Sequence, residues 1–431
     1  MVKDRFVPQH GTYPQGYRLG AIHCGVKKSG LDLTLLVADA PCTAAAVFTR
    51  NAFPAAPVQF DRALLARHHA NPRDHPIRAI LINAGCANAV TGTLGDKNAA
   101  AMAAAVNQHL AADADADATL VMSTGVIGQH LPMDRIEAGV PALYGQHLGR
   151  GHASWLAAAE GICTTDTFPK LRSRQYRLPS GREYCLAGVA KGAGMIHPNM
   201  ATMLSFMCTD AAIQADALQL ALRHAADRSF NAISVDGDTS TNDTVALLAN
   251  GAAWHAQRPS SSLSADDADY PAFRDQLTEF SAELAQLVVR DGEGASKFVT
   301  VTVKHAHDFD QAKTIASTIC TSALVKTALY GQDANWGRVL CAIGYAPGSE
   351  TSIRPERVSV TFKAAAQSGN HSLPVLRHGE PVPVDEAFAA ELLRNEDIEI
   401  HVDLGLGQEE ATMWTCDFSH DYVSINADYR S

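Results

Sequence analysis

The sequence has no long hydrophobic run and little aromatic character. No apolar stretch reaches the ~18 residues that a membrane-spanning helix needs, and Phe, Trp and Tyr make up only 6% of the 431 residues. The first ten residues show neither the apolar core of a secretory signal peptide nor the Arg and Ser bias of an organellar transit peptide. These absences argue against a membrane protein and predict a cytoplasmic one.

Positive charge is also scarce. The chain carries 35 Lys and Arg against 46 Asp and Glu, a formal net charge of −11. Nucleic acids and anionic membranes attract basic surfaces, so neither is the expected main partner. Small-molecule substrates fit this composition better.

Disulfide and metal patterns are missing as well. The nine cysteines are odd in number and scattered, with no C-x-x-C pair. This pattern is typical of reduced thiols in an intracellular enzyme. The eighteen histidines include no H-E-x-x-H arrangement. We therefore expect neither a disulfide frame nor a metal site.

What the chain does contain is a glycine-rich loop that runs into an apolar strand, over residues 191–210. Thr202 lies at the junction. If the bond between Ala201 and Thr202 is broken, the new α-amine has a pKa near ~7.7–8 and can take the proton from the threonine Oγ. A threonine in such a place is also typical of an ordinary strand residue, so the residues alone leave both interpretations open.

Three other stretches carry polar groups at turns. An apolar strand from Thr119 runs into Ser-Thr-Gly, where a hydroxyl and backbone N–H groups could form an oxyanion hole, although the spacing alone favours a plain strand-to-turn junction. Glu293 lies between two glycines, which favours a surface turn. Residues 233–244 crowd carboxylates and hydroxyls around one glycine, but the ligand spacing of a calcium-binding loop is missing.

The run from Lys191 to Leu204 closely resembles the self-cleavage and nucleophile motif of the bifunctional glutamate N-acetyltransferase/ornithine acetyltransferase family of arginine biosynthesis. Further matching segments extend from about Gly16 to the last residue. One of them, Val235–Asp243, is similar to the family's Val-Asp-Gly-Asp-Thr-Ser-Thr-Asn-Asp signature. The resemblance therefore covers nearly the whole chain.

The resemblance implies roles for individual residues. It makes Ala201–Thr202 the cleavage site, Thr202 the nucleophile, and Thr124 with Gly125 the oxyanion hole. We interpret Val235–Asp243 as a polar framework behind the site, without a catalytic role, and assign His197 no role. The implied substrate-binding residues are Thr165 (with Thr164 as the less favoured neighbour), Lys191, Thr202, Glu293, Asn426 and Ser431.

Four of these substrate residues carry a specific expectation. Glu293 would suit the positively charged amines of ornithine. Lys191 would hold a substrate carboxylate or keep the Thr202 amine neutral by like-charge repulsion. Asn426 and Ser431 keep the family's five-residue spacing, so the C-terminal tail is expected to fold back onto the site although termini usually fray.

The implied fold is α/β (α+β). A layered α/β/β/α domain of the N-terminal-nucleophile type would span residues 1–304 and be assembled across the cleavage site, from an alpha chain of residues 1–201 and a beta chain of residues 202–431. A smaller C-terminal α/β domain would span residues 305–431 and return its tail to the active site. The implied assembly is an α2β2 heterotetramer.

The implied reaction moves an acetyl group from N2-acetylornithine to L-glutamate through an acetyl-threonine. No cofactor is built in, and the resemblance leaves open whether acetyl-CoA serves as a second acetyl donor. Two alternatives remain from the sequence. One is an N-terminal-nucleophile amidohydrolase or aminopeptidase of the same architecture, and the other is an uncleaved ligand-binding relative without catalysis.

Overall fold

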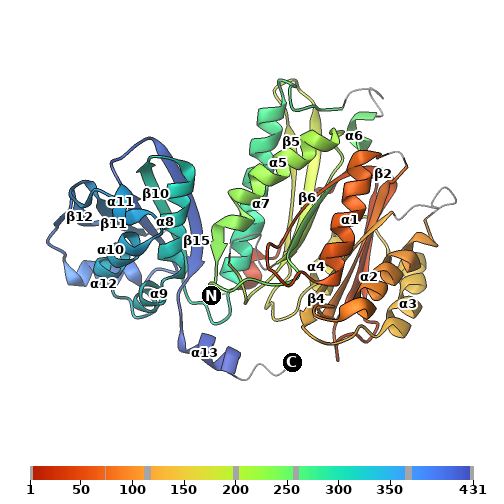
Figure 1. Cartoon of the computed structure of the whole chain (residues 1–431), viewed down its shortest axis with the longest axis horizontal. Helices are drawn as coiled ribbons and strands as arrows, with labels where there is room; N and C mark the ends of the chain where they lie inside the picture. Colours follow the sequence, from red (N-terminus) through yellow and green to blue (C-terminus); the bar gives the residue numbers. More distant parts are fainter. Residues whose placement is uncertain are drawn as a thin grey trace.

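The computed structural model describes residues 3–72, 74–110, 118–197, 203–255, 262–364 and 371–427. Their strands form two sheets in two domains that lie side by side (Figure 1). The larger domain holds the first sheet and the smaller domain the second. The mixed α/β class predicted from the sequence is confirmed.

The first sheet has the strand order β4-β3-β2-β9-β7-β6-β5, with β1 paired to β2. Strand β2 belongs to two half-sheets, because its residues 33–37 pair with β3 and its residues 43–48 pair with β9. We call β1, β3 and β4, with residues 33–37 of β2, the N-terminal half-sheet. The central half-sheet consists of residues 43–48 of β2 with β5, β6, β7 and β9. The strands are β1 (Tyr17–Ile22), β2 (Leu33–Phe48), β3 (Ile77–Cys86), β4 (Thr119–Val126), β5 (Lys170–Arg177), β6 (Glu183–Lys191), β7 (Leu204–Thr209) and β9 (Thr244–Ala249).

Apolar clusters show that the two half-sheets are stacked face to face and that helices cover their outer faces, which gives four layers. One cluster fills the space between them, with Ile82 and Met122 from one side and Val189 and Phe206 from the other. Helices α2 and α3 cover the outer face of the N-terminal half-sheet, and α5 and α7 cover that of the central half-sheet. The predicted α/β/β/α layering is therefore confirmed. The helices are α1 (Ala56–Ala70), α2 (Gly92–Asn107), α3 (Met133–Ala142), α4 (His152–Gly161), α5 (Ala215–Asp227), α6 (Ala252–His255) and α7 (Tyr270–Arg290).

The central strands are buried on both faces. Every residue of β7 and β9 is buried, and the two strands run parallel with Leu204 beside Thr244. Their near-continuous apolar runs suit strands covered on both sides. Because parallel neighbours start at the same edge, the segments that precede β7 and β9 meet at one end of the sheet.

The second sheet has the order β13-β12-β11-β14-β10-β15-β8. Its strands are β8 (Ile233–Ser234), β10 (Phe298–Ala306), β11 (Ser359–Ala364), β12 (Ser372–Arg377), β13 (Glu380–Pro381), β14 (Asp397–Asp403) and β15 (Glu409–Cys416). Its helices are α8 (Phe309–Thr321), α9 (Ala323–Tyr330), α10 (Trp336–Tyr345), α11 (Ser349–Ser352), α12 (Glu386–Leu393) and α13 (His420–Ala427). The expected domain boundary at residue 304 falls inside β10, which pairs with β14 and β15 of this sheet, and β8 joins the same sheet from an earlier part of the chain by pairing with β15. The division of the chain at residue 304 stays a prediction.

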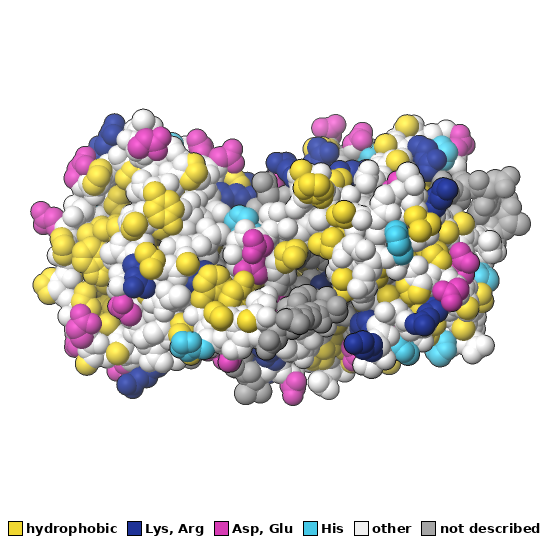
Figure 2. All heavy atoms as spheres, turned by 60° about the horizontal axis from the view of Figure 1, so that its bottom comes forward, with side chains coloured by type: hydrophobic (Ala, Val, Ile, Leu, Met, Phe, Trp, Pro, Cys, Tyr) yellow, Lys and Arg dark blue, Asp and Glu magenta, His cyan; other side chains and the backbone are white. Residues whose placement is uncertain are grey.

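Two features of the surface bear on partners. Among the described helices, none combines the length and the apolar character that crossing a bilayer requires. On the described part of the face in Figure 2, Lys and Arg side chains are scattered among acidic and apolar ones. Helix α13 lies below the junction of the two domains (Figure 1).

Candidate active site

A cavity of about 160 Å³ lies at the ends of β4 and β6 and just before the start of β9. Six residues expected in the site from the sequence line it together: Thr124, Gly125, Thr165, Lys191, Glu293 and Asn426. Its volume is below the ~300–1,000 Å³ of pockets for drug-sized ligands. The cavity therefore suits a small molecule rather than a polymer.

Three residues expected in the site, among them the nucleophile, are not part of the described structure. Ala201, Thr202 and Ser431 lie outside the described residues. The strand that follows the predicted cleavage site is nevertheless well placed, because Leu204 pairs with Lys191 and the Met203 carbonyl accepts a hydrogen bond of 3.1 Å from the Thr244 N–H. The chain that leads out of the cleavage motif thus begins its strand beside a residue of the cavity wall.

The end of β4 brings a glycine and a threonine into this wall. Gly125 has a φ of +130°, and a Cβ there would lie 2.3 Å from the carbonyl carbon of Gly85, so only glycine fits. The Lys191 Nζ lies 3.4 Å from the Thr124 Oγ1. An ammonium group only donates, so the Thr124 hydroxyl must accept there and keeps its own hydrogen for another acceptor. This is the arrangement that an oxyanion-stabilising hydroxyl needs.

The segment before β9 also lines the cavity, through Ser240, Thr241 and Asn242. The Asn242 amide donates to the Ala87 carbonyl at 2.6 Å and to the Ser123 carbonyl at 2.8 Å, and so ties the end of β4 to the neighbouring loop. The sequence interpretation placed this segment behind the site, which is wrong for these three residues. The sequence did not indicate that β9 runs parallel beside β7, and this pairing brings the starts of both strands to one edge of the sheet.

The tail helix α13 also contributes to the cavity wall, through Asn426. The Asn426 Nδ2 donates to the Glu293 Oε2 at 3.0 Å, and Glu293 is 9% exposed. The Glu293 N–H donates to the Ala193 carbonyl at 2.9 Å. Gly194 permits this close approach, because a Cβ there would lie 2.4 Å from the Glu293 Oε2. The glycine-rich loop, the Glu293 turn and the tail therefore fit together here.

The Thr-Thr-Asp motif contributes both of its threonines to the cavity wall. The lining therefore does not distinguish Thr165, which the sequence favours, from Thr164. The Thr164 N–H donates to the Asp166 Oδ2 at 2.9 Å. His197, which the sequence leaves without a role, lies with its Nδ1 3.3 Å from the Ser234 Oγ, and burial lowers its pKa.

The glycine-rich loop is held by Asp236. This carboxylate accepts hydrogen bonds from the N–H groups of Met195 (2.6 Å) and Ile196 (2.9 Å). Burial raises the pKa of Asp236 from 3.8 to about 6, although these backbone N–H groups favour the charged form. The folded chain thus binds more protons than the unfolded chain between pH values of about 4 and 6.

We expect this carboxylate to make stability depend on pH. As pH rises from about 4 to 6, its contribution lowers the free energy of unfolding by up to ~3 kcal/mol. Asp236→Asn removes that component, so the stability of the variant relative to wild type should increase over this range. Urea unfolding at several pH values measures the difference. Asp275→Asn, at an exposed position of α7, is the control, and parallel curves for wild type and Asp236→Asn would contradict the assignment.

A larger cavity, of about 580 Å³, lies elsewhere. Its walls include Arg228 and Lys313, but these cations already have partners. Arg228 lies over the Phe309 ring, and the Lys313 Nζ donates to the Asp227 carbonyl at 3.1 Å. Among the described residues, no group of three or more His, Cys, Asp or Glu side chains could hold a metal ion. We therefore assign the chemistry to the smaller cavity, which contains the glycine-rich loop.

Comparison with known proteins identifies the relatives. The ArgJ family model matches residues 18–431. The chain is 54% identical over 443 residues to the arginine biosynthesis bifunctional protein ArgJ, mitochondrial, of Verticillium alfalfae, covering 100% of this chain and 93% of the relative. It is also 54% identical over 442 residues to the protein of the same name from Chaetomium globosum, covering 100% and 91%.

Two solved structures are similar over about half of this chain. The arginine biosynthesis bifunctional protein argJ of Bacillus halodurans is 36% identical, with a TM-score of 0.45, over 51% of this chain and 96% of that one. The ornithine acetyltransferase of Mycobacterium tuberculosis, solved with ornithine, is 32% identical, with a TM-score of 0.36, over 46% and 96%.

The relatives correct one expectation. Those from Verticillium alfalfae, Chaetomium globosum and Arthroderma otae are all named mitochondrial, which overturns the predicted cytoplasmic location. The prediction rested on the lack of a long apolar run and of a signal- or transit-peptide pattern in the first ten residues. The location in the names of these relatives outweighs both features.

Proposed function

The chain belongs to the ArgJ family of arginine biosynthesis, and on that premise we propose that it transfers an acetyl group from N2-acetylornithine to L-glutamate through an ester on Thr202. The observation that carries the proposal is one cavity lined by Thr124, Gly125, Lys191 and Glu293 beside the start of β7. A small polar cavity with opposite charges in its wall suits an amino-acid substrate.

Thr202 must first become an N-terminal residue. Its Oγ attacks the Ala201 carbonyl carbon, the peptide C–N bond breaks, and the proton from Oγ passes to the departing nitrogen. Water then hydrolyses the resulting ester, which leaves chains of 201 and 230 residues from the 431. The freed α-amine, with an ordinary pKa of ~7.7–8, is the general base that the threonine otherwise lacks.

Transfer then follows in two halves. The α-amine takes the proton from Oγ as Oγ attacks the acetyl carbon of N2-acetylornithine. The amide C–N bond breaks, and the proton goes to the departing amine of ornithine. The amine of glutamate attacks the acetyl ester in the second half, and Oγ recovers a proton. Thr124 and Gly125 stabilise the oxyanion in both halves.

The two charged residues of the wall position the substrates. Lys191 pairs with a substrate carboxylate, or its charge keeps the nearby α-amine neutral. Glu293 pairs with the side-chain ammonium of ornithine, and its bond from Asn426 fixes the carboxylate that does so. Thr165, Asn426 and Ser431 complete the binding set as the family resemblance implies.

The wider proposal includes a second donor and an assembly. The relatives are named bifunctional, so we include acetyl-CoA as a co-substrate that loads the same threonine, with no resident cofactor. The two cleavage products are proposed to assemble as an α2β2 heterotetramer. Membership of the ArgJ family favours acetyl transfer over the amidohydrolase alternative.

Mass spectrometry of the trapped intermediate tests the proposal. The purified protein is mixed with N2-acetylornithine alone, quenched in acid and analysed under denaturing conditions. We expect one added acetyl group on the fragment that begins at Thr202, and its removal when glutamate is present. Loss of the acetyl group to water at the same rate without glutamate would favour a hydrolase.

Glu293 provides a substrate-specific prediction. Glu293→Gln keeps the shape of the side chain but removes the charge, so kcat/KM for N2-acetylornithine should fall by about tenfold to a hundredfold, as for loss of a hydrogen bond to a charged group of ~1.5–3 kcal/mol. Cleavage before Thr202 should persist. Steady-state kinetics and denaturing gels measure the two effects.

Glu283→Gln is the matched control, because Glu283 lies on α7 in an ion pair with Arg174 and does not line the cavity. If Glu293→Gln abolishes both transfer and cleavage, Glu293 supports the structure rather than the substrate.

A further inference from the structure

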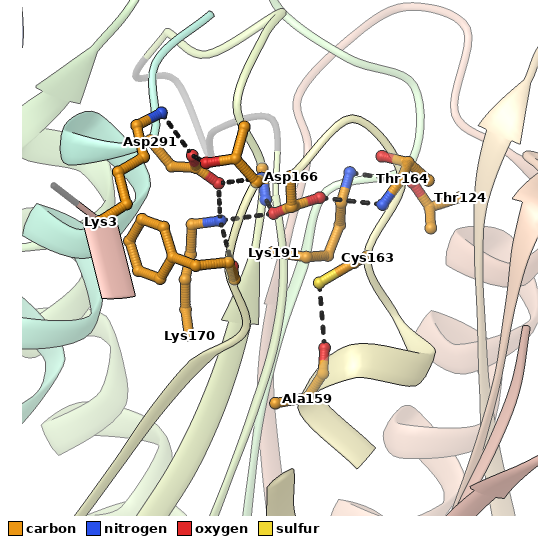
Figure 3. Close-up of polar contacts among 12 residues, drawn as sticks. Lys3, Thr124, Ala159, Cys163, Thr164, Asp166, Lys170, Lys191 and Asp291 are labelled. Atoms are coloured by element: carbon orange, nitrogen blue, oxygen red, sulfur yellow. Dashed lines mark hydrogen bonds and ion pairs between the residues drawn. The ribbon is translucent and has the colours of Figure 1, made fainter. Parts of the chain in front are cut away.

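A lysine is completely buried behind the cavity. Lys170, the first residue of β5, is 0% exposed, and its Nζ lies 2.6 Å from the Asp166 Oδ1 and 2.6 Å from the Asp291 Oδ2 (Figure 3). Both carboxylates are buried as well. Burying three charges costs free energy unless they are paired and hydrogen-bonded. The backbone groups that these charges bind therefore indicate what the network does.

Each carboxylate also holds backbone of the cavity wall. Asp166 accepts from the Gly192 N–H at 2.7 Å and from the Thr164 N–H at 2.9 Å. Asp291 accepts from the Thr167 N–H at 2.9 Å, and it lies two residues before Glu293 in the same turn. The threonine motif, the loop after Lys191 and the Glu293 turn therefore meet at one ammonium group.

The charges are balanced. Lys3 adds a second cation at 2.8 Å from the Asp291 Oδ1, so two lysines face two carboxylates. Burial alone would raise the pKa of Asp166, but Lys170, Lys191 and the Gly192 N–H together outweigh burial and hold it well below its ordinary value. Burial alone would lower the pKa of Lys170, and the two carboxylates raise it instead. Asp166 and Lys170 thus stay charged at neutral pH.

We propose that Lys170 is a positioning residue that, through Asp166 and Asp291, aligns the threonine motif, the Lys191 loop and the Glu293 turn around the substrate. The inference rests on the proposed function for what the cavity binds. It also places the network across the predicted cut, since Asp166 and Lys170 precede Thr202 and Asp291 follows it. The buried ion pairs would then hold the two halves of the cavity wall together after cleavage.

Lys170→Met tests this role. The substitution leaves the two carboxylates without their shared cation, so Asp166 should become protonated as pH falls and release a backbone N–H. We expect kcat/KM for acetyl transfer to fall by about tenfold to a hundredfold and to show a new decline below neutral pH that the wild type lacks. The double variant Lys170→Met/Asp166→Asn has no titrating carboxylate at this position and should lose the new pH dependence, while its rate should stay low because the amide can accept only one of the two N–H bonds.

Arg174→Met is the control, because Arg174 lies on the same strand in an exposed ion pair with Glu283. Amide hydrogen exchange adds a readout that needs no turnover. Peptides that contain Thr164 and Gly192 should exchange faster in Lys170→Met than in wild type. In the control, the same peptides should exchange at the wild-type rate. If Lys170→Met does not yield folded protein, Asp166→Asn, which can accept only one of the two N–H bonds, replaces it in both measurements.

The outcomes separate the two proposals. A wild type without acetyl transfer refutes the proposed function, while the exchange result still decides whether Lys170 orders the wall. An active wild type whose variant matches it in rate, pH profile and exchange refutes the positioning role. A variant that is merely less stable, with a wild-type pH profile and exchange at Thr164 and Gly192, would show a structural role only.

Discussion

Wild-type protein under denaturing conditions should separate into fragments of 201 and 230 residues, whereas Thr202→Ala should remain one chain of 431 residues and transfer no acetyl group. The reason is that one hydroxyl performs both reactions. Without Oγ the Ala201 carbonyl has no intramolecular nucleophile. Without cleavage the α-nitrogen stays in an amide and cannot act as a base.

Intact-mass analysis, with transfer assayed on the same samples, is the measurement. Thr202→Ser keeps a hydroxyl and should still cleave. Thr300→Ala, in β10 of the smaller domain, is a control that should cleave and turn over as wild type. A wild-type chain that stays intact on incubation and transfers nothing would favour the uncleaved ligand-binding alternative. An intact chain that does transfer acetyl would require another nucleophile.

Thr124→Ala is the second substitution with a large expected effect. Removing one oxyanion donor usually lowers kcat by about 10²–10³-fold, or ~3–4 kcal/mol of barrier. Lys191 already occupies an acceptor position of the Thr124 hydroxyl at 3.4 Å, so the hydroxyl hydrogen is free to stabilise a developing negative charge. Thr124→Ser keeps that hydrogen and should retain most of the activity.

The rate should be measured by rapid-quench formation of the acetyl-enzyme on protein that is already cleaved, so that slow maturation does not count as slow transfer. Thr300→Ala again serves as the control. Turnover of Thr124→Ala within about twofold of wild type would remove Thr124 from the oxyanion hole. Gly125→Ala is a poorer test, because its Cβ would collide with the Gly85 backbone at 2.3 Å and disturb the pairing of β3 with β4.

The sequence predicted more of the site than of its surroundings. Thr124, Lys191 and Glu293 were all expected in the site because each lies in a segment that resembles the family, and they line one cavity. The sequence interpretation placed Asn242 behind the site. Its place in the cavity wall depends on hydrogen bonds to the carbonyls of Ala87 and Ser123, and both residues lie more than a hundred positions earlier in the chain. Such bonds leave no mark on local pattern.

Lys170 shows the same limit more sharply. A lysine that begins a strand made almost entirely of polar residues is typical of an exposed position, yet Lys170 is fully buried between two carboxylates. Lys170 is buried because the turn with Asp291 and the segment with Asp166 both contact this first residue of β5. No property of residues 166–170 alone indicates that Asp291 will be there.

The resemblance of short runs to the ArgJ family therefore determined the proposed chemistry and the layered α/β class, whereas the residue types alone left the threonine at the loop-to-strand junction open to an ordinary strand role. The tertiary structure alone decided which segments share the cavity. It did so by setting β9 parallel beside β7, bending β2 through two half-sheets and bringing α13 back to Glu293. These contacts join residues far apart in the chain, and their free energy comes from burial and pairing that exist only after folding.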